Sequence, residues 1–120
     1  MSHVHHGIDY VEFNTPDLAA TRDFLASAFG WAFTAYGPEY AGIHDGRAGG
    51  VEAGGIAAGV AAPPLVILYS SDLDATERAV RAAGGEVTVA PYDFPGGRRF
   101  HFREPGGAEM AVWSDAEQTA

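Results

Sequence analysis

One stretch of this chain occurs twice, and the repeat restricts the folds that are open to the chain. Asp17-Leu18-Ala19-Ala20-Thr21 returns as Asp72-Leu73-Asp74-Ala75-Thr76, an offset of 55 residues. A solenoid needs three or more repeats, and here two copies stand in 120 residues. The repeat therefore predicts one domain made of two similar halves. Flanking residues keep the same offset in five pairs: Val11 and Val66, Phe13 and Leu68, Leu25 and Val80, Ala28 and Ala83, Gly30 and Gly85.

The first half is predicted to contain a strand, a helix and three further strands. Thr15-Pro16-Asp17 is typical of a helix start with Thr15 as the cap, and Phe29-Gly30 is typical of a helix end. Runs rich in β-branched and aromatic residues between turn signals predict the strands. These are expected at Ile8–Asn14, Trp31–Tyr36, Tyr40–Asp45 and Gly55–Val60.

After a hinge at Ala61–Pro64, the second half repeats this order. A cap at Ser71 or Asp72 opens a helix over Leu73–Ala83. Pro91–Gly97 is expected to be a loop, and either a lid or a simple connection. Glu104-Pro105-Gly106-Gly107 is expected to turn a hairpin. The strands are expected at Leu65–Ser70, Glu86–Ala90, Arg99–Arg103 and Glu109–Trp113.

These elements predict an α+β fold of two βαβββ modules, residues 8–60 and 65–113. We expect a curved, partly closed eight-stranded sheet around a cleft, with the helices outside. Alternate residues of a strand face opposite sides of a sheet. The helices therefore cover Val11, Phe13, Val66 and Leu68, and residues of the other parity line the cleft. A flexible N-terminus, 1–7, and a tail, 114–120, flank the domain.

The composition excludes several kinds of chemistry. Without cysteine the chain has no disulfide, thiolate nucleophile or cysteine zinc site, and without lysine it has no Schiff base. A net charge of −9 argues against nucleic acid and anionic membranes, and favours neutral or cationic ligands unless it serves solubility. The longest apolar run, 55–68, is broken by glycine and proline and is unsuited to a membrane span, and the polar residues 1–6 do not resemble a signal peptide. We expect a cytoplasmic protein, which the lack of cysteine fits.

Several motifs follow one another in a characteristic order. They are Ile8-Asp9-Tyr10-Val11, the two Asp-Leu-x-Ala-Thr helix starts, Phe29-Gly30-Trp31 and Glu104-Pro105-Gly106-Gly107. Over residues 8–113 the chain resembles the vicinal-oxygen-chelate superfamily, which contains glyoxalases, bleomycin resistance proteins and extradiol dioxygenases. The segment 11–17 and Phe-Gly-Trp are most similar to a glyoxalase-related branch of that superfamily.

The resemblance implies a divalent metal held by His or Glu side chains at four strand positions. In this sequence, those positions fall on Tyr10, Gly59, Leu65 and Ala111. These side chains do not make a site of imidazole and carboxylate ligands. We therefore expect a branch that lacks the metal ligands, with neither a metal nor another cofactor.

Two carboxylates lie close in the sequence to the positions where the superfamily carries its metal ligands. Glu12 is two residues after Tyr10 and Glu109 two before Ala111, so each shares a strand face with its neighbour. Each is a candidate general acid or base, or a group that binds a cation or hydroxyl. A pocket without metal ligands suits an aromatic compound, unless its aromatic residues only pack the seam between the halves. The predicted pocket comprises Tyr10, Gly59, Leu65, Ile67, Tyr69, Ala111 and Trp113.

His101 lies between Phe100 and Phe102 on a predicted strand. If its face looks into the cleft, His101 is a third acid–base candidate. If it faces outward, Arg99, His101 and Arg103 form a solvated row.

Three functions are compatible with these patterns. The first is metal-independent binding of an aromatic or cationic small molecule, as in the antibiotic-binding members of the superfamily. The second is a lyase or isomerase of glyoxalase type that uses Glu12, Glu109 or His101 as acid–base groups. The third is a dimeric scaffold without a ligand. We also expect a homodimer, since members of this superfamily frequently pair.

Overall fold

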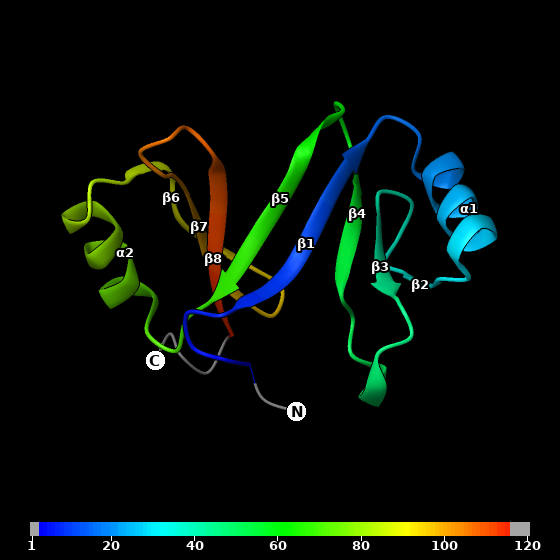
Figure 1. Ribbon diagram of the computed structural model, residues 1–120, viewed down its shortest axis with the longest axis horizontal. Helices are drawn as coiled ribbons and strands as arrows, with labels where there is room; N and C mark the ends of the chain where they lie inside the picture. The colour runs from blue at the N-terminus through cyan, green and yellow to red at the C-terminus, as the bar shows by residue number, and fades with distance from the viewer. Residues whose placement is uncertain (1–2, 116–120) are drawn as a thin grey trace. The chain divides into compact units, whose positions relative to one another are not determined.

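The computed structural model describes residues 3–115, in which the elements follow the order β–α–β–β–β twice (Figure 1). Its described residues form two compact units, which we call unit 1 (Tyr10–Leu65) and unit 2 (residues 3–9 and 66–115). The first five elements are β1 (Ile8–Thr15), α1 (Leu18–Phe29), β2 (Ala32–Ala35), β3 (Tyr40–His44) and β4 (Gly54–Ala58). A short 3-10 helix, η1 (Ala48–Gly50), precedes β4. The next five are β5 (Ala62–Tyr69), α2 (Leu73–Ala82), β6 (Glu86–Phe94), β7 (Gly97–Arg103) and β8 (Glu109–Asp115). The predicted α+β class with two βαβββ modules is confirmed.

The strands of the two modules pair in the same way. In the first, the order is β2-β3-β4-β1, with β4 parallel to β1 and the other pairs antiparallel. In the second, the order is β6-β7-β8-β5, with β8 parallel to β5. The internal repeat of the sequence is therefore a repeat of topology.

The repeated Asp-Leu-x-Ala-Thr segment caps both helices. Asp17 accepts a hydrogen bond from the Ala20 N–H at 3.0 Å, and Asp72 accepts one from the Ala75 N–H at 3.1 Å. Of the two predicted caps of α2, Ser71 and Asp72, the structure confirms Asp72. The prediction of Thr15 as the cap of α1 is wrong, because the carboxylate of Asp17 reaches the first turn instead.

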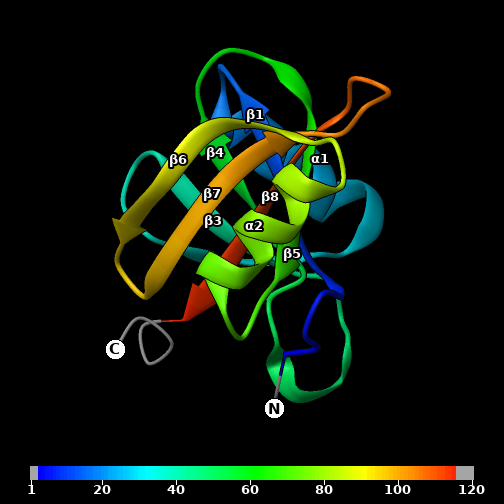
Figure 2. The same ribbon diagram turned by 90° about the vertical axis from the view of Figure 1, so that its left-hand side faces the viewer.

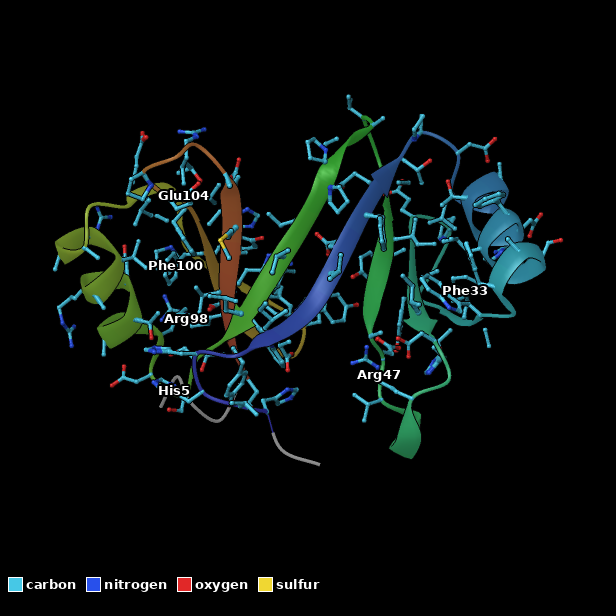
Figure 3. All side chains as sticks on the ribbon, viewed as in Figure 1. His5, Phe33, Arg47, Arg98, Phe100 and Glu104 are labelled. Atoms are coloured by element: carbon cyan, nitrogen blue, oxygen red, sulfur yellow. The ribbon has the colours of Figure 1, made fainter. Side chains whose placement is uncertain are left out.

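Helix α2 lies against the strands of unit 2 (Figure 2), and the core of this unit lies between them. Phe100 is fully buried, and it packs with Leu73 of α2 and Val112 of β8. Figure 3 labels Phe100 on the side of the strands that faces α2. Leu68 also packs against this cluster, as its strand parity predicts.

In unit 1, the buried apolar residues lie on the strands and none lies on the helix. Ala41, Ile43 and Ile56 are buried on one face of its sheet. Helix α1 contributes no buried residue, and its Phe24 and Phe29 side chains are exposed. Unit 1 therefore depends on its strands for its core.

Three predicted irregular segments belong to strands. Most of the predicted lid, Pro91–Gly97, lies in β6 and β7, which leave a short turn at residues 95–96. Proline is tolerated there because β6 is an edge strand whose register shifts next to Pro91. The predicted hinge Ala61–Pro64 is not a separate connection, because β5 begins at Ala62 and includes the rest of the segment. Strand β8 runs to Asp115, two residues into the predicted tail, and the remainder of that tail lies outside the described residues.

Within residues 3–115, neither helix has the length and apolar character needed to cross a membrane.

Candidate functional site

One face of the sheet in unit 1 carries polar side chains at its centre. Glu12 pairs with Gly55 of β4, and Gly55 pairs with Gly42 of β3, so these three residues share a face. The buried Ile43 and Ile56 lie on the opposite face. We call the face of Glu12 the polar face. Its glycines leave room for the large polar groups of neighbouring residues.

A hydrogen-bond chain crosses the polar face. The Tyr40 hydroxyl donates to Glu12 Oε2 at 3.0 Å, and the Tyr10 and Tyr40 hydroxyl oxygens are 2.8 Å apart. Since the single proton of Tyr40 goes to Glu12, Tyr10 is the donor in the second bond. The lone pairs of the Tyr10 oxygen can then accept a proton from a ligand. The chain connects Tyr10 to a carboxylate that is only 8% exposed.

Burial keeps both phenols protonated. It raises the pKa of Tyr10 to about 12, and the hydrogen bond with Tyr40 opposes that shift. Burial also raises the pKa of Tyr40, with the contacts to Tyr10 and Glu12 acting in the same direction. Both side chains are therefore neutral hydrogen-bonding groups at physiological pH.

A second polar group lies beside the first in unit 1. The Tyr36 hydroxyl donates to the Glu52 carboxylate, and this bond raises the pKa of Tyr36. His44 Nε2 lies 3.9 Å from Glu52 Oε2 and 2.7 Å from the Thr34 hydroxyl. The Glu52 carboxylate occupies the space that a side chain at Gly42 would fill.

The corresponding face of unit 2 is aromatic. Ile67 pairs with Ala111, and Tyr69 pairs with Trp113, on the side of the sheet away from Phe100 and Val112. The Tyr69 and Trp113 rings meet edge to face, with centroids 5.4 Å apart. Sequence parity placed these residues on one face, and the structure does so too.

Two carboxylates border the aromatic pair. Asp9 Oδ2 accepts from Trp113 Nε1 at 3.0 Å, and Asp115 Oδ1 accepts from the Tyr69 hydroxyl at 2.8 Å. The His3 ring lies against both aromatic rings, and its Nδ1 is 2.8 Å from Asp9 Oδ1. We call Tyr69, Trp113, Asp9 and Asp115 the aromatic site.

His101 shares the face of Ala111, its partner across β7 and β8. Its Nδ1 lies 3.7 Å from Glu109 Oε2, and its Nε2 lies 3.2 Å from the Tyr92 hydroxyl. Arg99 donates to the same hydroxyl at 2.6 Å. Glu109 is exposed and also accepts from Thr88 at 3.0 Å. Unit 2 thus brings His101 and Glu109 together, whereas Glu12 belongs to unit 1.

The position predicted at Gly59 is wrong by four residues. Ala111 pairs with Ile67, and the repeat partner of Ile67 is Glu12, which pairs with Gly55. Gly59 is exposed beyond the end of β4. Gly55 is buried, and the Tyr40 and Tyr10 hydroxyls fill the space beside it.

The side chains at the four metal positions of the superfamily do not fit a metal ion. With the corrected register, these positions carry Tyr10, Gly55, Leu65 and Ala111, which offer a single protonated phenol among them. Leu65 lies half-buried on β5. Across residues 3–115, the structure places no group of three or more His, Asp or Glu side chains where they could hold a metal.

Four residues of these sites are not predicted from the sequence patterns: His3, Asp9, Tyr40 and Gly55. The signal for Tyr40 and Gly55 is their register across β3 and β4. Asp9 precedes Tyr10 in the first motif, but its contact with Trp113 joins residues 104 apart in the chain.

Comparisons with known proteins agree with the fold and with the sequence resemblance. The family model of the glyoxalase/bleomycin resistance protein/dioxygenase superfamily matches residues 7–112. The chain is 32% identical to the anthracycline biosynthesis protein DnrV of Streptomyces peucetius, over 87% of this chain and 45% of that protein. The same values hold for the anthracycline biosynthesis protein DauV of Streptomyces sp. strain C5. The chain thus spans about half the length of these relatives.

Solved structures share the fold. The Mn(II)-bound glyoxalase from Novosphingobium aromaticivorans is 27% identical, with a TM-score of 0.70, over 92% of this chain and 39% of that one. The methylmalonyl-CoA epimerase from Mycobacterium tuberculosis is 16% identical, with a TM-score of 0.66, over 97% and 93% of the two chains. The repeated βαβββ module and the match over residues 7–112 lead to one conclusion. The chain belongs to the glyoxalase/bleomycin resistance protein/dioxygenase superfamily.

Proposed function

We propose that this chain binds an aromatic or cationic small molecule and does so without a metal ion. The observation that carries the proposal is the aromatic site of unit 2. There the Tyr69 and Trp113 rings lie beside the carboxylates of Asp9 and Asp115. Aromatic faces next to carboxylates favour planar rings and positive charge. The net charge of −9 acts in the same direction.

The relatives support an aromatic ligand. DnrV and DauV are named as anthracycline biosynthesis proteins, and anthracyclines are built on a planar system of fused rings. This chain covers 45% of their length, so the transfer of that ligand class is part of our proposal.

Two planar probes of opposite charge test the proposal. Proflavine, a cation, is expected to raise the thermal midpoint in the presence of EDTA. At 100 times its dissociation constant, a ligand stabilises the native state by about 2.7 kcal/mol. Anthraquinone-2-sulfonate, an anion, is expected to bind more weakly, because it meets the carboxylates of the aromatic site.

A pair of tryptophan variants locates the binding. Trp113→Ala is expected to abolish the proflavine shift, whereas Trp31→Ala, in unit 1, retains it. Both side chains are half-buried, so they are matched in burial. Absence of a shift with either probe, or a requirement for added metal, contradicts the proposal. Absence of any ligand across a broad library favours the dimeric scaffold.

The polar face of unit 1 supports a second candidate, acid–base catalysis of glyoxalase type. Tyr10 and Tyr40 connect a buried carboxylate to the end of a hydrogen-bond chain. A proton taken from a substrate at Tyr10 passes to Tyr40 and then to Glu12, each phenol giving up one proton as it accepts another. In unit 2, His101 and Glu109 are the other candidate acid–base pair.

Turnover with EDTA present tests this candidate. The substrate is the hemithioacetal of methylglyoxal and glutathione, and the product is measured as thioester. Loss of a general base lowers turnover by about 10²–10⁴-fold. Glu12→Gln is expected to show this loss if the chain through Tyr40 is used, and Glu109→Gln if the pair in unit 2 is used. Glu86→Gln, an exposed residue paired with Arg103 at 3.1 Å, is the control. Absence of turnover in the unmodified protein rejects this candidate.

A further inference from the structure

We propose that the His3 ring occupies the aromatic site as an internal stand-in for the ligand, and that a planar ligand binds there by displacing it. The inference rests on the proposed function, because it concerns the same site. It adds how the site is filled without ligand and which chemical groups a ligand needs.

The contacts of His3 are those of a bound planar ring. The imidazole stacks on Tyr69, with centroids 4.6 Å apart and planes at 22°. It meets Trp113 edge to face, at 5.0 Å and 84°. Its Nδ1 lies 2.8 Å from one oxygen of Asp9, whose other oxygen accepts from Trp113. The carboxylate of Asp9 thus holds both the Trp113 ring and the His3 ring that occupies the site.

The segment that carries His3 can leave without disturbing a core. The His3 side chain is 33% exposed, and the neighbouring Val4 is 70% exposed. The chain is held further along, where His6 N–H donates to the Tyr69 carbonyl at 2.6 Å and Tyr69 N–H donates to the Gly7 carbonyl at 3.1 Å. Displacement of His3 therefore breaks its own ring contacts and one hydrogen bond, while these backbone bonds remain.

These contacts define the ligand class. The ring stacks on Tyr69, so the ligand presents a flat aromatic surface. The group facing Asp9 is a nitrogen, so the ligand carries an N–H donor or a positive charge at its edge. A planar aromatic amine or a cationic heteroaromatic compound meets both conditions.

His5 provides a matched control on the same segment. Its ring stacks on His6 with centroids 3.7 Å apart, and its Nδ1 accepts from the Ser71 N–H at 2.9 Å. Figure 3 labels His5 near the start of α2. Replacement of His5 removes an imidazole from the segment but leaves the aromatic site filled by His3.

Proflavine titrations by calorimetry test the displacement. A ligand that competes with an internal occupant binds with an affinity reduced by the fraction of time the site is empty. Two ring contacts and one hydrogen bond are expected to keep the site filled about 90% of the time. His3→Ala is therefore expected to bind proflavine about tenfold more tightly than the unmodified protein, and His5→Ala as tightly as the unmodified protein. Equal or weaker binding by His3→Ala overturns the inference.

A second measurement follows His3 directly in the unmodified protein. Its ring protons lie against Tyr69 and Trp113, so their NMR signals are shifted by ring currents. On saturation with proflavine, they are expected to move to the positions seen for an unstructured histidine. Signals that stay in place while proflavine binds overturn the inference and leave the proposed function standing. Absence of proflavine binding in every variant overturns both.

Discussion

Phe100→Ala is expected to lower the free energy of unfolding by about 3–5 kcal/mol, the usual cost of removing a buried phenylalanine ring. Phe100 is fully buried and packs with Leu73 and Val112 between the sheet of unit 2 and α2. Its removal leaves a cavity that these neighbours fill only in part. Urea denaturation followed by far-ultraviolet circular dichroism measures the change.

Phe24→Ala, the same substitution in α1, is the matched control. Phe24 is 63% exposed, so its removal is expected to change the free energy of unfolding by less than about 1 kcal/mol. If Phe24→Ala lowers the free energy of unfolding as much as Phe100→Ala does, α1 contributes to a core, which contradicts our description of α1 as a helix without buried residues.

Gly55→Ala is expected to destabilise the protein by about 1–3 kcal/mol. A Cβ at this position would lie 2.0 Å from the Tyr40 hydroxyl oxygen and 2.7 Å from that of Tyr10. Both phenols must move, which breaks the hydrogen-bond chain to Glu12. Urea denaturation measures the loss.

Gly59→Ala is the control, and it also tests the register. No heavy atom lies within 4 Å of the added carbon at Gly59, so stability is expected to stay within about 1 kcal/mol of the unmodified protein. If Gly59 were the residue beside Tyr10, as the sequence alone suggested, the larger loss would occur there.

The fold was predictable because the sequence contains an internal repeat, one copy in each βαβββ module. The repeat places Asp17 and Asp72 at the same point of each module, and both cap a helix. Strand parity also placed Leu68 toward α2 and Ile67, Tyr69 and Trp113 on the opposite face. These features are local, so the residues themselves carry the information.

The site was predictable only in part, because its contacts join distant strands. Gly59 was assigned by matching two glycine pairs, but the segment before β4 contains η1, and the match does not follow the strand register. Tyr40 reaches Glu12 across Gly55, a contact that depends on the pairing of β3 with β4. His3 reaches Tyr69 across more than sixty positions of the chain, and nothing in its local sequence indicates this.

The shape of β6 limits how copies of this protein can associate. This strand is at an edge of its sheet, and its pairing with β7 shifts register between Val87 and Val89 and again between Val89 and Tyr92, the segment that contains Pro91. Extension of the sheet by a strand of a second molecule requires regular hydrogen bonds along β6. The irregular register of β6, the absence of an N–H at Pro91 and the charges of Glu86 and Asp93 oppose such pairing. Edge-to-edge assembly of copies through β6 is therefore disfavoured.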